Sequence, residues 1–337
     1  MNAVRPLLIA GLGARRADDT AAICAFCAKH RIPAMVTYKA KGVVPDADPC
    51  FAGVFTNGAI ERTLIEECDL IVGLGLDPVE LLPRPWTFRQ PVIGAGRWPC
   101  PDAHVPFASQ WTTDISRAAA RLSDRWRASA WALDRVAYVQ SSTRRATDIP
   151  TPGLSAQQVV DVAAGLLAAD CRVTVDAGAH MLPATLRWPV RDPAGMLISN
   201  GLSTMGFALP AAIGAALIDR APVVALTGDG GLLMCAGELL TAARQRLPVI
   251  TVVFNDASLS LIEIKQQARR LRPDGVALGA VSWRALGESL GVASFAARDE
   301  NELVRAIEQA KAEDGPTLIE AAVDRSNYGA MLKVIRG

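Results

Sequence analysis

The sequence predicts an α/β protein of two domains, each a parallel sheet flanked by helices. Short apolar runs typical of buried strands alternate with helix-like stretches over most of the chain, which is the pattern of strands joined by crossover helices. A polar, proline-bearing stretch over 141–152 interrupts this alternation. The 337 residues suffice for about two domains. We therefore expect a first domain over 1–126, a linker over 127–153 and a second domain over 154–337.

The first domain shows apolar runs of strand length separated by longer helical stretches. The expected strands are Leu7–Ala10, Ala34–Thr37, Leu70–Gly73, Val92–Gly94 and Pro106–Ser109. The expected helices are Asp18–Lys29, Ala59–Glu67 and Thr113–Arg125. The opening residues run directly into Gly11-Leu12-Gly13, which reads as a first strand and turn and not as a signal peptide.

The second domain repeats the alternation more regularly. The expected strands are Arg172–Asp176, Met196–Ser199, Val223–Thr227, Val249–Phe254, Val292–Phe295 and Thr317–Ala322. The expected helices are Ser155–Ala168, Phe207–Ile218, Glu238–Gln245, Leu259–Gln267, Trp283–Leu290 and Glu300–Glu313.

Composition argues against several classes of protein. The 35 basic and 34 acidic residues give a net charge of +1, which disfavours a general binder of nucleic acid or of anionic membranes. No apolar run approaches the roughly 20 residues that a membrane span needs. Seven scattered cysteines are an odd number in a chain of this size, so we expect free thiols in a reducing cytoplasm. Cys24 and Cys27 form a CxxC within an apolar helical stretch, which favours core packing over metal or redox use.

The stretch from Gly228 to Asp256 carries the strongest chemical signal. Asp229 follows one expected strand within Gly228-Asp229-Gly230-Gly231, and Asp256 follows the next. Parallel strands end at the same edge of a sheet, so both carboxylates can converge on one cation, and the glycines leave backbone N–H groups open to a phosphate. This indicates a diphosphate held through a divalent metal. The alternative is an ordinary turn at Asp229 and a helix N-cap at Asp256.

Two further loops bear on a ligand. Ser199–Pro210 is rich in glycine and small residues that permit close approach of a ligand, with Met205 as a large flexible side chain whose alternative is simple core packing. Gly11-Leu12-Gly13 lies between a strand and a helix, but Arg16 stands where a dinucleotide motif has its third glycine. A tight turn or a nucleotide or FAD phosphate site remain open there.

These residues resemble the thiamine diphosphate (ThDP) enzymes of the acetolactate synthase and 2-oxo acid decarboxylase superfamily. In residues 172–330 the resemblance rests on Asp176–His180, Ser199–Pro210, Gly228–Gly230 and Asn255-Asp256. In residues 1–125 it rests on Lys39–Pro45 and Asp69–Pro78, which are similar to the middle domain of the same superfamily. The resemblance implies two Rossmann-like domains, a middle domain followed by the ThDP-binding fold.

The resemblance also implies roles for individual residues. Asp229 and Asp256 would bind Mg²⁺ through their side chains, with Asp256 in place of the family's usual asparagine, and the Ser258 carbonyl would be a third ligand. Met205 would support the bent cofactor, and the backbone of Ser203 would accept a hydrogen bond from its amino group. The remaining residues expected to bind the cofactor are Gly178, His180, Thr204, Gly228, Gly230, Gly231 and Leu261. Met205 and His180 are the residues of this chain with expected catalytic roles.

Members of this superfamily usually begin with a pyrimidine-binding domain that carries an activating glutamate, and no stretch of this sequence fills that role. We therefore expect the chain to be the large subunit of a split, cytoplasmic ThDP enzyme. A separate pyrimidine-domain subunit would complete a hetero-tetramer or larger assembly that acts on a small 2-oxo acid. The alternatives are a fragment of a longer protein, or a catalytically incomplete protein that binds ThDP or a nucleotide in a regulatory or structural role.

The sequence indicates the cofactor more clearly than the outcome of the reaction, which is either decarboxylation or carboligation. Leu261 and Ile262 align with substrate-facing positions of the relatives, and both are apolar. Apolar side chains there offer no proton donor, which favours a carboligase over a decarboxylase.

Overall fold

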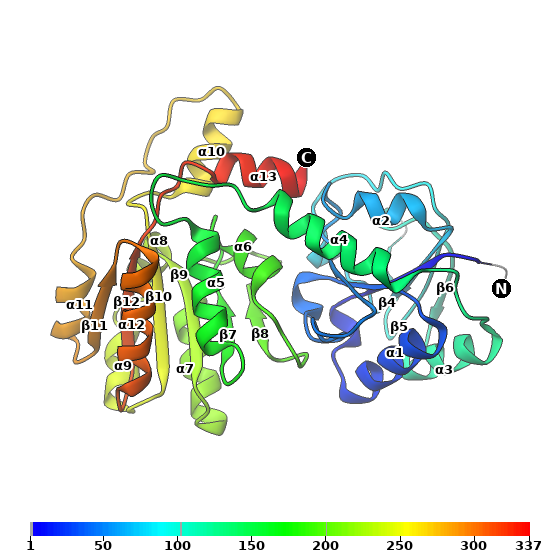
Figure 1. The fold of residues 1–337 in the computed structure, drawn as a ribbon, viewed down its shortest axis with the longest axis horizontal. Coiled ribbons are helices and arrows are strands. Elements are labelled where there is room, and N and C mark those ends of the chain that lie inside the picture. Colours follow the sequence, from blue (N-terminus) through cyan, green and yellow to red (C-terminus); the bar gives the residue numbers. More distant parts are fainter. Residues whose placement is uncertain (1–2, 102, 200) are drawn as a thin grey trace. The chain divides into compact units, whose positions relative to one another are not determined.

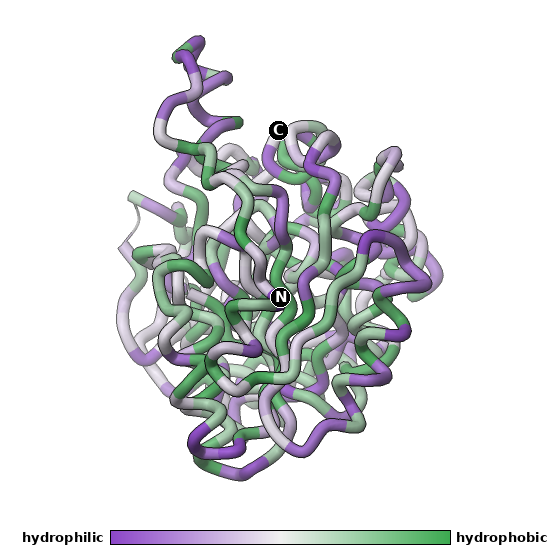
Figure 2. The backbone as a smooth tube through the Cα atoms, turned by 90° about the vertical axis from the view of Figure 1, so that its left-hand side faces the viewer, coloured by the Kyte–Doolittle hydropathy of each residue, from purple (hydrophilic) through white to green (hydrophobic). Residues whose placement is uncertain are grey.

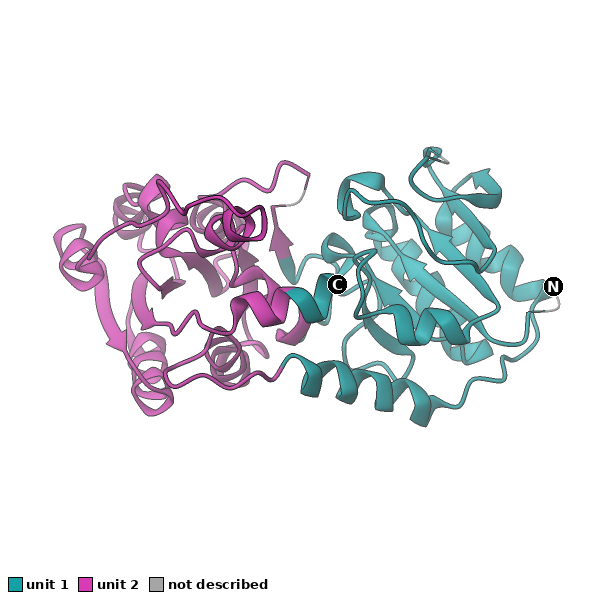
Figure 3. Cartoon of the chain, turned by 90° about the horizontal axis from the view of Figure 1, so that it is seen from above, with its two compact units in different colours: residues 1–147, 189–196, 333–337 teal, residues 148–188, 197–332 magenta. Residues whose placement is uncertain are grey.

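The computed structural model describes residues 3–101, 103–199 and 201–337, and the chain divides into two compact units (Figure 3). The first unit comprises Met1–Thr147, Pro189–Met196 and Lys333–Gly337, and the second comprises Asp148–Trp188 and Leu197–Leu332. Each unit is built around one six-stranded sheet with helices packed against it (Figure 1). The predicted α/β fold of two parallel sheets flanked by helices is confirmed.

The sheet of the first unit has the strand order β3-β2-β1-β4-β5-β6, and all its pairings are parallel. This order is that of a doubly wound dinucleotide-binding fold. Its strands are β1 (Pro6–Ala10), β2 (Ala34–Val36), β3 (Phe51–Val54), β4 (Leu70–Leu74), β5 (Val92–Gly96) and β6 (Phe107–Thr112). Its helices are α1 (Ala17–His30), α2 (Arg62–Glu67), α3 (Ile115–Arg125) and α4 (Leu133–Ala146), with 3-10 turns η1 (Leu12–Ala14), η2 (Tyr38–Ala40) and η3 (Pro78–Glu80).

Alternate side chains of β1 serve two separate cores, as the period of a strand requires. Leu8 and Ala10 join the buried cluster formed with α1 and α3. Leu7 and Ile9 join the cluster on the opposite face, to which α2 and α4 contribute. A strand buried on both faces reads as a continuous apolar run, which is why the Pro6–Ala10 run was recognisable in the sequence.

The segment 127–153, which we expected to be a linker, contains the helix α4. Val136 and Val139 lie one helical turn apart on α4, are 1% and 4% exposed and belong to the core of the first unit. The rest of the helix is rich in charged and polar residues. Two buried valines in a polar helix give a weak sequence pattern, so only packing against the sheet reveals this helix as part of the fold.

The sheet of the second unit has the order β11-β12-β10-β9-β7-β8. Its strands are β7 (Arg172–Val175), β8 (Met196–Ile198), β9 (Val223–Gly228), β10 (Val249–Asn255), β11 (Ala293–Ala297) and β12 (Thr317–Ala322). The pairings among β7, β9, β10, β12 and β11 are parallel. The helices assigned here are α5 (Ala156–Leu167), α6 (Met181–Arg187), α7 (Ala208–Asp219), α8 (Asp229–Cys235), α9 (Glu238–Arg244), α10 (Ser260–Ala268), α11 (Trp283–Ser289), α12 (Glu300–Ala312) and α13 (Tyr328–Arg336).

The second sheet changes direction between β7 and β9. The chain runs outward from β7 to β8 and then returns to build β9, β10 and β12 on the other side. In open α/β sheets the crevice beyond the carboxyl ends of the strands at such a point is where ligands bind. Asp176 follows β7 directly, and β9 ends at Gly228, so the motif residues lie at this switch point.

Hydrophobic stretches of backbone run through the interior, and most hydrophilic stretches lie at the periphery (Figure 2). Within the described residues, no helix combines the length and the apolar character of a membrane span.

Candidate functional site

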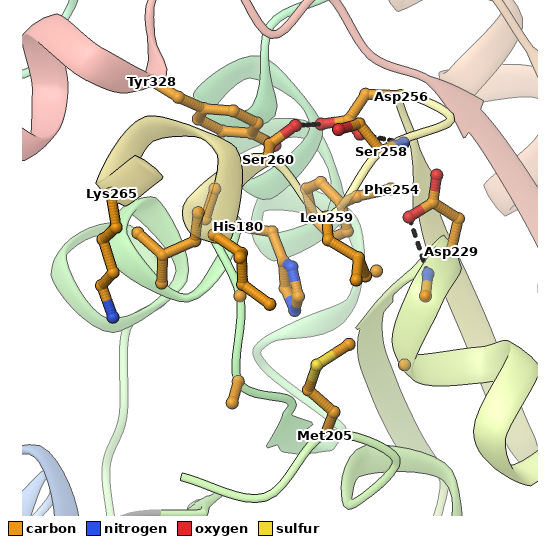
Figure 4. A pocket seen from close by; sticks show the side chains of 18 of the residues that line it. His180, Met205, Asp229, Phe254, Asp256, Ser258, Leu259, Ser260, Lys265 and Tyr328 are labelled. Carbon is orange, nitrogen blue, oxygen red and sulfur yellow. Dashed lines mark hydrogen bonds between the residues drawn. The ribbon is translucent and has the colours of Figure 1, made fainter. Parts of the chain in front are cut away.

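A pocket lies at the carboxyl ends of the second sheet's strands (Figure 4). Its lining includes the turn after β7, the loop before α7, the start of α8, the turn that leads into α10, and residues of α10 and α13. The predicted site residues in its lining are Gly178, His180, Ser203, Met205, Gly228, Asp229, Gly230, Gly231, Asp256, Ser258 and Leu261. Thr204 is exposed outside this lining and donates its backbone N–H to Ser199 Oγ at 2.8 Å. Asn200, in the same predicted loop, lies outside the described residues.

Asp229 is the first residue of α8 and is 4% exposed. Its Oδ1 atom accepts the Gly230 backbone N–H at 2.7 Å, whereas its Oδ2 atom is buried without a hydrogen-bond partner. Burial raises the pKa of Asp229, and backbone amides from Gly230 and the 256–258 turn oppose this shift. A buried carboxylate oxygen without a partner is costly unless a ligand satisfies it.

Asp256 follows β10 and is held by the turn that it begins. Its Oδ1 atom accepts the Ser258 backbone N–H at 3.0 Å, and its Oδ2 atom accepts the Ser260 hydroxyl at 2.7 Å. The helix N-cap that the sequence left open as an alternative is not found, because the N-cap of α10 is Leu259 without a side-chain capping bond, so the two bonds of Asp256 hold the preceding turn instead. These two hydrogen bonds leave further acceptor sites of the carboxylate available, because a carboxylate offers about four lone-pair sites.

The raised pKa of Asp256 and its closeness to Asp229 favour a cation bound between the two carboxylates. Burial raises the pKa of Asp256 to about 6, and the nearby Asp229 carboxylate adds to the rise. A buried and a half-buried carboxylate that repel each other favour an intervening divalent ion. Within the described residues, this site included, no group of three or more His, Cys, Asp or Glu side chains is placed to hold a metal. A small number of protein ligands is enough for Mg²⁺, because the ion usually keeps phosphate oxygens and water in its coordination shell.

Asp176 has no predicted role beyond its motif, yet it organises the site. It is fully buried, and its carboxylate accepts backbone N–H groups of Gly206 at 2.9 Å and Phe207 at 3.1 Å. It also accepts the Thr227 hydroxyl at 3.0 Å. These bonds fasten the Met205 loop and the start of α7 to the ends of β7 and β9. A lone aspartate after a strand was the available signal, but it does not reveal its partners.

The glycines of the site are required by the packing of the protein itself. A Cβ atom on Gly231 would lie 2.1 Å from Asp176 Oδ2, and one on Gly230 would lie 2.3 Å from a Leu259 methyl group and 3.3 Å from the Met205 Cε methyl carbon. We expected these glycines because a phosphate needs close backbone approach. The structure adds a second reason, because any side chain there would displace the Asp176 carboxylate or Leu259.

His180 stands between the two strands that flank the switch point. Its ring stacks on Phe254 with centroids 5.1 Å apart, and Cβ atoms at Gly178 and Gly228 would lie within 3.3 Å of it. Burial lowers the pKa of His180 to about 4, although the Asp176 carboxylate opposes the shift. The imidazole is therefore neutral at pH 7, and its Nε2 atom is buried without a hydrogen-bond partner. This leaves one ring nitrogen available to a ligand.

Ile262, expected at a substrate-facing position, also lines the pocket. Five further lining residues were not placed in the site from the sequence, namely Phe254, Leu259, Ser260, Lys265 and Tyr328. Tyr328 belongs to α13, and burial raises its pKa well above the ordinary value, with Asp256 and Asp229 adding to the rise. No local pattern marks a tyrosine so distant in the sequence as part of this site.

The Gly11–Arg16 segment in the first unit is explained by the packing of two loops. Gly11 and Gly13 donate backbone N–H groups to Leu74 and Gly75 carbonyls, each at 2.9 Å. A Cβ atom on Gly11 would lie 2.4 Å from the Gly75 oxygen. The turn interpretation accounts for both glycines without a bound nucleotide.

All seven cysteines are free thiols in the structure. Cys27 of the CxxC is buried in the first unit's core, and burial raises the pKa of its thiol well above the ordinary value. A thiol that does not ionise is a poor nucleophile and metal ligand, which supports the core-packing interpretation.

Comparison with known proteins assigns both halves of the chain to one family. Residues 176–321 match the model of the thiamine pyrophosphate enzyme C-terminal TPP-binding domain, and residues 1–93 match that of the thiamine pyrophosphate enzyme central domain. The chain is 26% identical to an acetolactate synthase of Bacillus subtilis, over 96% of this chain and 59% of the relative. It is 28% identical to the catabolic acetolactate synthase of Raoultella terrigena, over 96% and 60%.

A third relative has another printed activity. The chain is 30% identical to the "Probable 2-ketoarginine decarboxylase AruI" of Pseudomonas aeruginosa, over 94% of this chain and 57% of the relative. The chain thus spans less than two thirds of the length of these curated relatives. The matched segments include β1 to β4 of the first sheet and most of β8 to β12 of the second. The C-terminal model begins at Asp176 and includes Asp229 and Asp256. This chain therefore belongs to the thiamine pyrophosphate enzyme family, of which it carries the central domain and the C-terminal TPP-binding domain.

Proposed function

We propose that this chain is the large subunit of a split ThDP-dependent enzyme that decarboxylates or ligates a 2-oxo acid. The observation that carries the proposal is the unpartnered, buried Asp229 Oδ2 atom beside Asp256, in the same pocket as Met205. A metal-bound diphosphate at this edge would satisfy that oxygen and offset the charge of both carboxylates. Acetolactate synthases and a decarboxylase among the relatives support the substrate class.

The residues that would hold the cofactor divide into two groups. Asp229, Asp256 and the Ser258 carbonyl would bind Mg²⁺, and backbone N–H groups at the start of α8 would face the diphosphate. Met205, fixed through the Gly206 bond to Asp176, would support the cofactor's bent shape. When bound, ThDP supplies an electron sink for the loss of CO₂ from a 2-oxo acid.

Three of the pocket's side chains are poor proton donors. Leu261 and Ile262 present apolar side chains to the pocket, and His180 is unprotonated at pH 7 because its pKa is lowered to about 4. None of these three side chains readily gives a proton to the product at neutral pH. This supports a carboligase outcome over simple protonation of the product.

A partner would have to supply the activating glutamate, because no glutamate lines the pocket among the described residues. Exposed apolar side chains lie beside the pocket. Leu202 in the loop before α7 is 93% exposed, and Met234 on α8 is 63% exposed. A Cβ atom on Gly206 would lie 3.4 Å from Met234 Cβ, so the loop and α8 are neighbours. Exposed apolar groups that border a site are typical of a surface that another protein covers. We infer that a pyrimidine-binding subunit covers the exposed surface around Leu202 and Met234.

The cofactor assignment is tested by calorimetric titration of the purified chain with ThDP and MgCl₂. Asp229→Ala is expected to abolish binding because it removes the oxygen left without a partner. Asp256→Asn is expected to retain binding because an amide oxygen still ligates Mg²⁺. Tight binding by Asp229→Ala would refute the site. Adenine nucleotide in place of ThDP, found by mass spectrometry of the denatured protein, would favour the nucleotide-binding alternative.

The split-enzyme assignment is tested by co-expression with the neighbouring reading frames. The chain is expected to co-purify with a small α/β protein and to consume pyruvate or another 2-oxo acid only in its presence. Met234→Asp should weaken that association, whereas Val304→Asp, on the exposed surface of α12, should not. Full activity of this chain alone would contradict the proposal.

A further inference from the structure

The pocket contains a cationic side chain that the cofactor site does not use. Leu261, Ile262 and Lys265 of α10 all line it, and their spacings of three and four residues place them on one face of the helix. Lys265 is the only basic residue in this lining among the described residues. In Figure 4 its side chain lies across His180 from Asp229, away from the two carboxylates.

The charge of Lys265 is not neutralised within the protein. No hydrogen bond or ion pair joins its ammonium to another described residue, and its side chain is exposed to solvent. The acidic residue nearest to it in sequence, Glu263, is engaged elsewhere. Glu263 Oε2 accepts the Ser258 hydroxyl at 2.9 Å and pairs with Arg325 at 2.5 Å. An unpaired ammonium beside apolar side chains is suited to an anionic group of a small ligand.

We propose that Lys265 is a specificity-determining residue that binds a carboxylate of the substrate, namely one that remains in the product. The inference rests on the proposed function, in which the substrate is a 2-oxo acid. Leu261 and Ile262 would contact the carbon skeleton, and Lys265 would bind the anionic end. The pocket would thus have a metal-binding acidic end and a carboxylate-binding basic end.

The chemistry of decarboxylation decides which carboxylate this is. A carboxylate that leaves as CO₂ loses its negative charge as the reaction proceeds. A cation beside it would stabilise the ground state more than the transition state and would slow the reaction. A carboxylate that stays keeps its charge, so its bond to Lys265 lowers the energies of both states and strengthens binding.

Two substrates offer such a carboxylate, and the test separates them. One is a 2-oxo dicarboxylic acid, bound through its distal carboxylate. The other is a second 2-oxo acid that accepts the first in a carboligation and is bound through the carboxylate next to its ketone. The probes are 2-oxoglutarate and its 5-methyl ester, which share a skeleton and differ in the distal charge.

Affinities are measured by ligand-observed NMR on the full chain loaded with ThDP and MgCl₂. Lys265→Met is expected to weaken 2-oxoglutarate binding by roughly three- to tenfold, as for an exposed charge pair, and Lys265→Arg is expected to restore most of it. Lys311→Met, on the exposed face of α12, is the control and should change nothing. If the ester keeps its affinity in Lys265→Met, the distal carboxylate is the group bound. If ester and acid weaken equally, the carboxylate beside the ketone is bound.

Wild-type affinity of Lys265→Met for both probes would overturn the inference. A loss that Lys265→Arg also shows in full would overturn it too, since packing and not charge would then be responsible. Calorimetry with ThDP on the same preparations distinguishes this failure from that of the proposed function. Normal ThDP binding with unchanged probe affinity refutes only the role of Lys265, whereas absent ThDP binding refutes the cofactor site.

Discussion

Single buried polar side chains at the ends of β7 and β9 set the properties of this site. Both carboxylate oxygens of Asp176 accept hydrogen bonds from the protein, whereas the Oδ2 atom of Asp229 has no hydrogen-bond partner. The same residue type at two neighbouring strand ends therefore has two different tasks. What separates them is the set of N–H groups within reach, because a carboxylate that is already satisfied has less to gain from a cation.

Asp176→Asn is expected to lower the free energy of unfolding of the second unit by about 3 kcal/mol. An amide has one acceptor oxygen, and its NH₂ group would face the N–H groups of Gly206 or Phe207, which leaves buried donors unsatisfied. Thr227→Val, which removes one donor to the same carboxylate, is the milder control and should cost about 1 kcal/mol. Urea unfolding measures both, and a fully stable Asp176→Asn would show that the loop is held by other contacts.

His180 is expected to make the free protein less stable in acid. Its pKa is lowered from 6.5 to about 4 in the fold, so the unfolded chain binds more protons between these values. The contribution of a neutral His180 is therefore complete above pH 6.5 and is lost as the pH falls toward 4, by about 3 kcal/mol. Asp256 acts in the opposite direction, because its raised pKa of about 6 stabilises the folded state below that pH.

The measurement is therefore a difference between two proteins. The free energy of unfolding of wild type minus that of His180→Gln should shrink as the pH is lowered from 6.5 to 4, since only the histidine titrates differently. His104→Gln, at an exposed position, is the control. A constant difference across this range would mean that His180 is not buried in the neutral form.

Helices differ in how clearly their sequences predict them. The start of α5 carries a capping box between Ser155 and Gln158, and its boundaries were predicted to within a residue. Helix α6 was missed, and Pro183 near its start is one reason, because proline suggests a turn. Helix α8 was also not among the expected helices, because Gly228-Asp229-Gly230-Gly231 reads as a loop. Its first turn is helical in spite of its glycines, which pack against Leu259 and Asp176.

The helix α4 provides a test of tertiary packing at the scale of one element. Val136→Ala and Val139→Ala should each destabilise the first unit by about 1–3 kcal/mol, because each leaves a cavity in a buried cluster. Tyr138→Ala on the same helix is the control at 55% exposure and should cost less than about 1 kcal/mol. Circular dichroism during thermal unfolding measures the effect. Equal, small effects for all three variants would mean that α4 does not belong to this core.

Each of the two units of the whole molecule has its own sheet and core. Binding of ThDP should therefore change amide hydrogen exchange in the second unit and leave the first unit unchanged. ThDP with MgCl₂ is expected to slow amide hydrogen exchange in 201–207, 229–235 and 256–261 of the second unit, because binding stabilises the state that holds the ligand. The Gly11–Arg16 segment should not change. Asp229→Ala should show no protection at all. Protection of the Gly11–Arg16 segment instead would indicate a nucleotide-type site in the first unit.

The two parallel sheets, most of their strands and the motifs that identify the family were predictable from the sequence. Strands buried on both faces are apolar runs, and glycine-flanked aspartates at strand ends are local signals that survive without coordinates. The short strand β3 was not predicted, because Phe51-Ala52-Gly53-Val54 contains a glycine and has too few residues for a recognisable apolar pattern.

The separate roles of the motif residues could not be predicted and emerged from the folded arrangement. It placed Tyr328 and Lys265 in the pocket, turned Asp176 toward the Met205 loop and left Asp229 Oδ2 without a partner. These facts depend on distances between segments that are far apart in the chain. Periodicity and spacing describe neighbours in sequence, whereas burial, pKa shifts and unsatisfied hydrogen bonds arise only when the folded chain brings distant groups together.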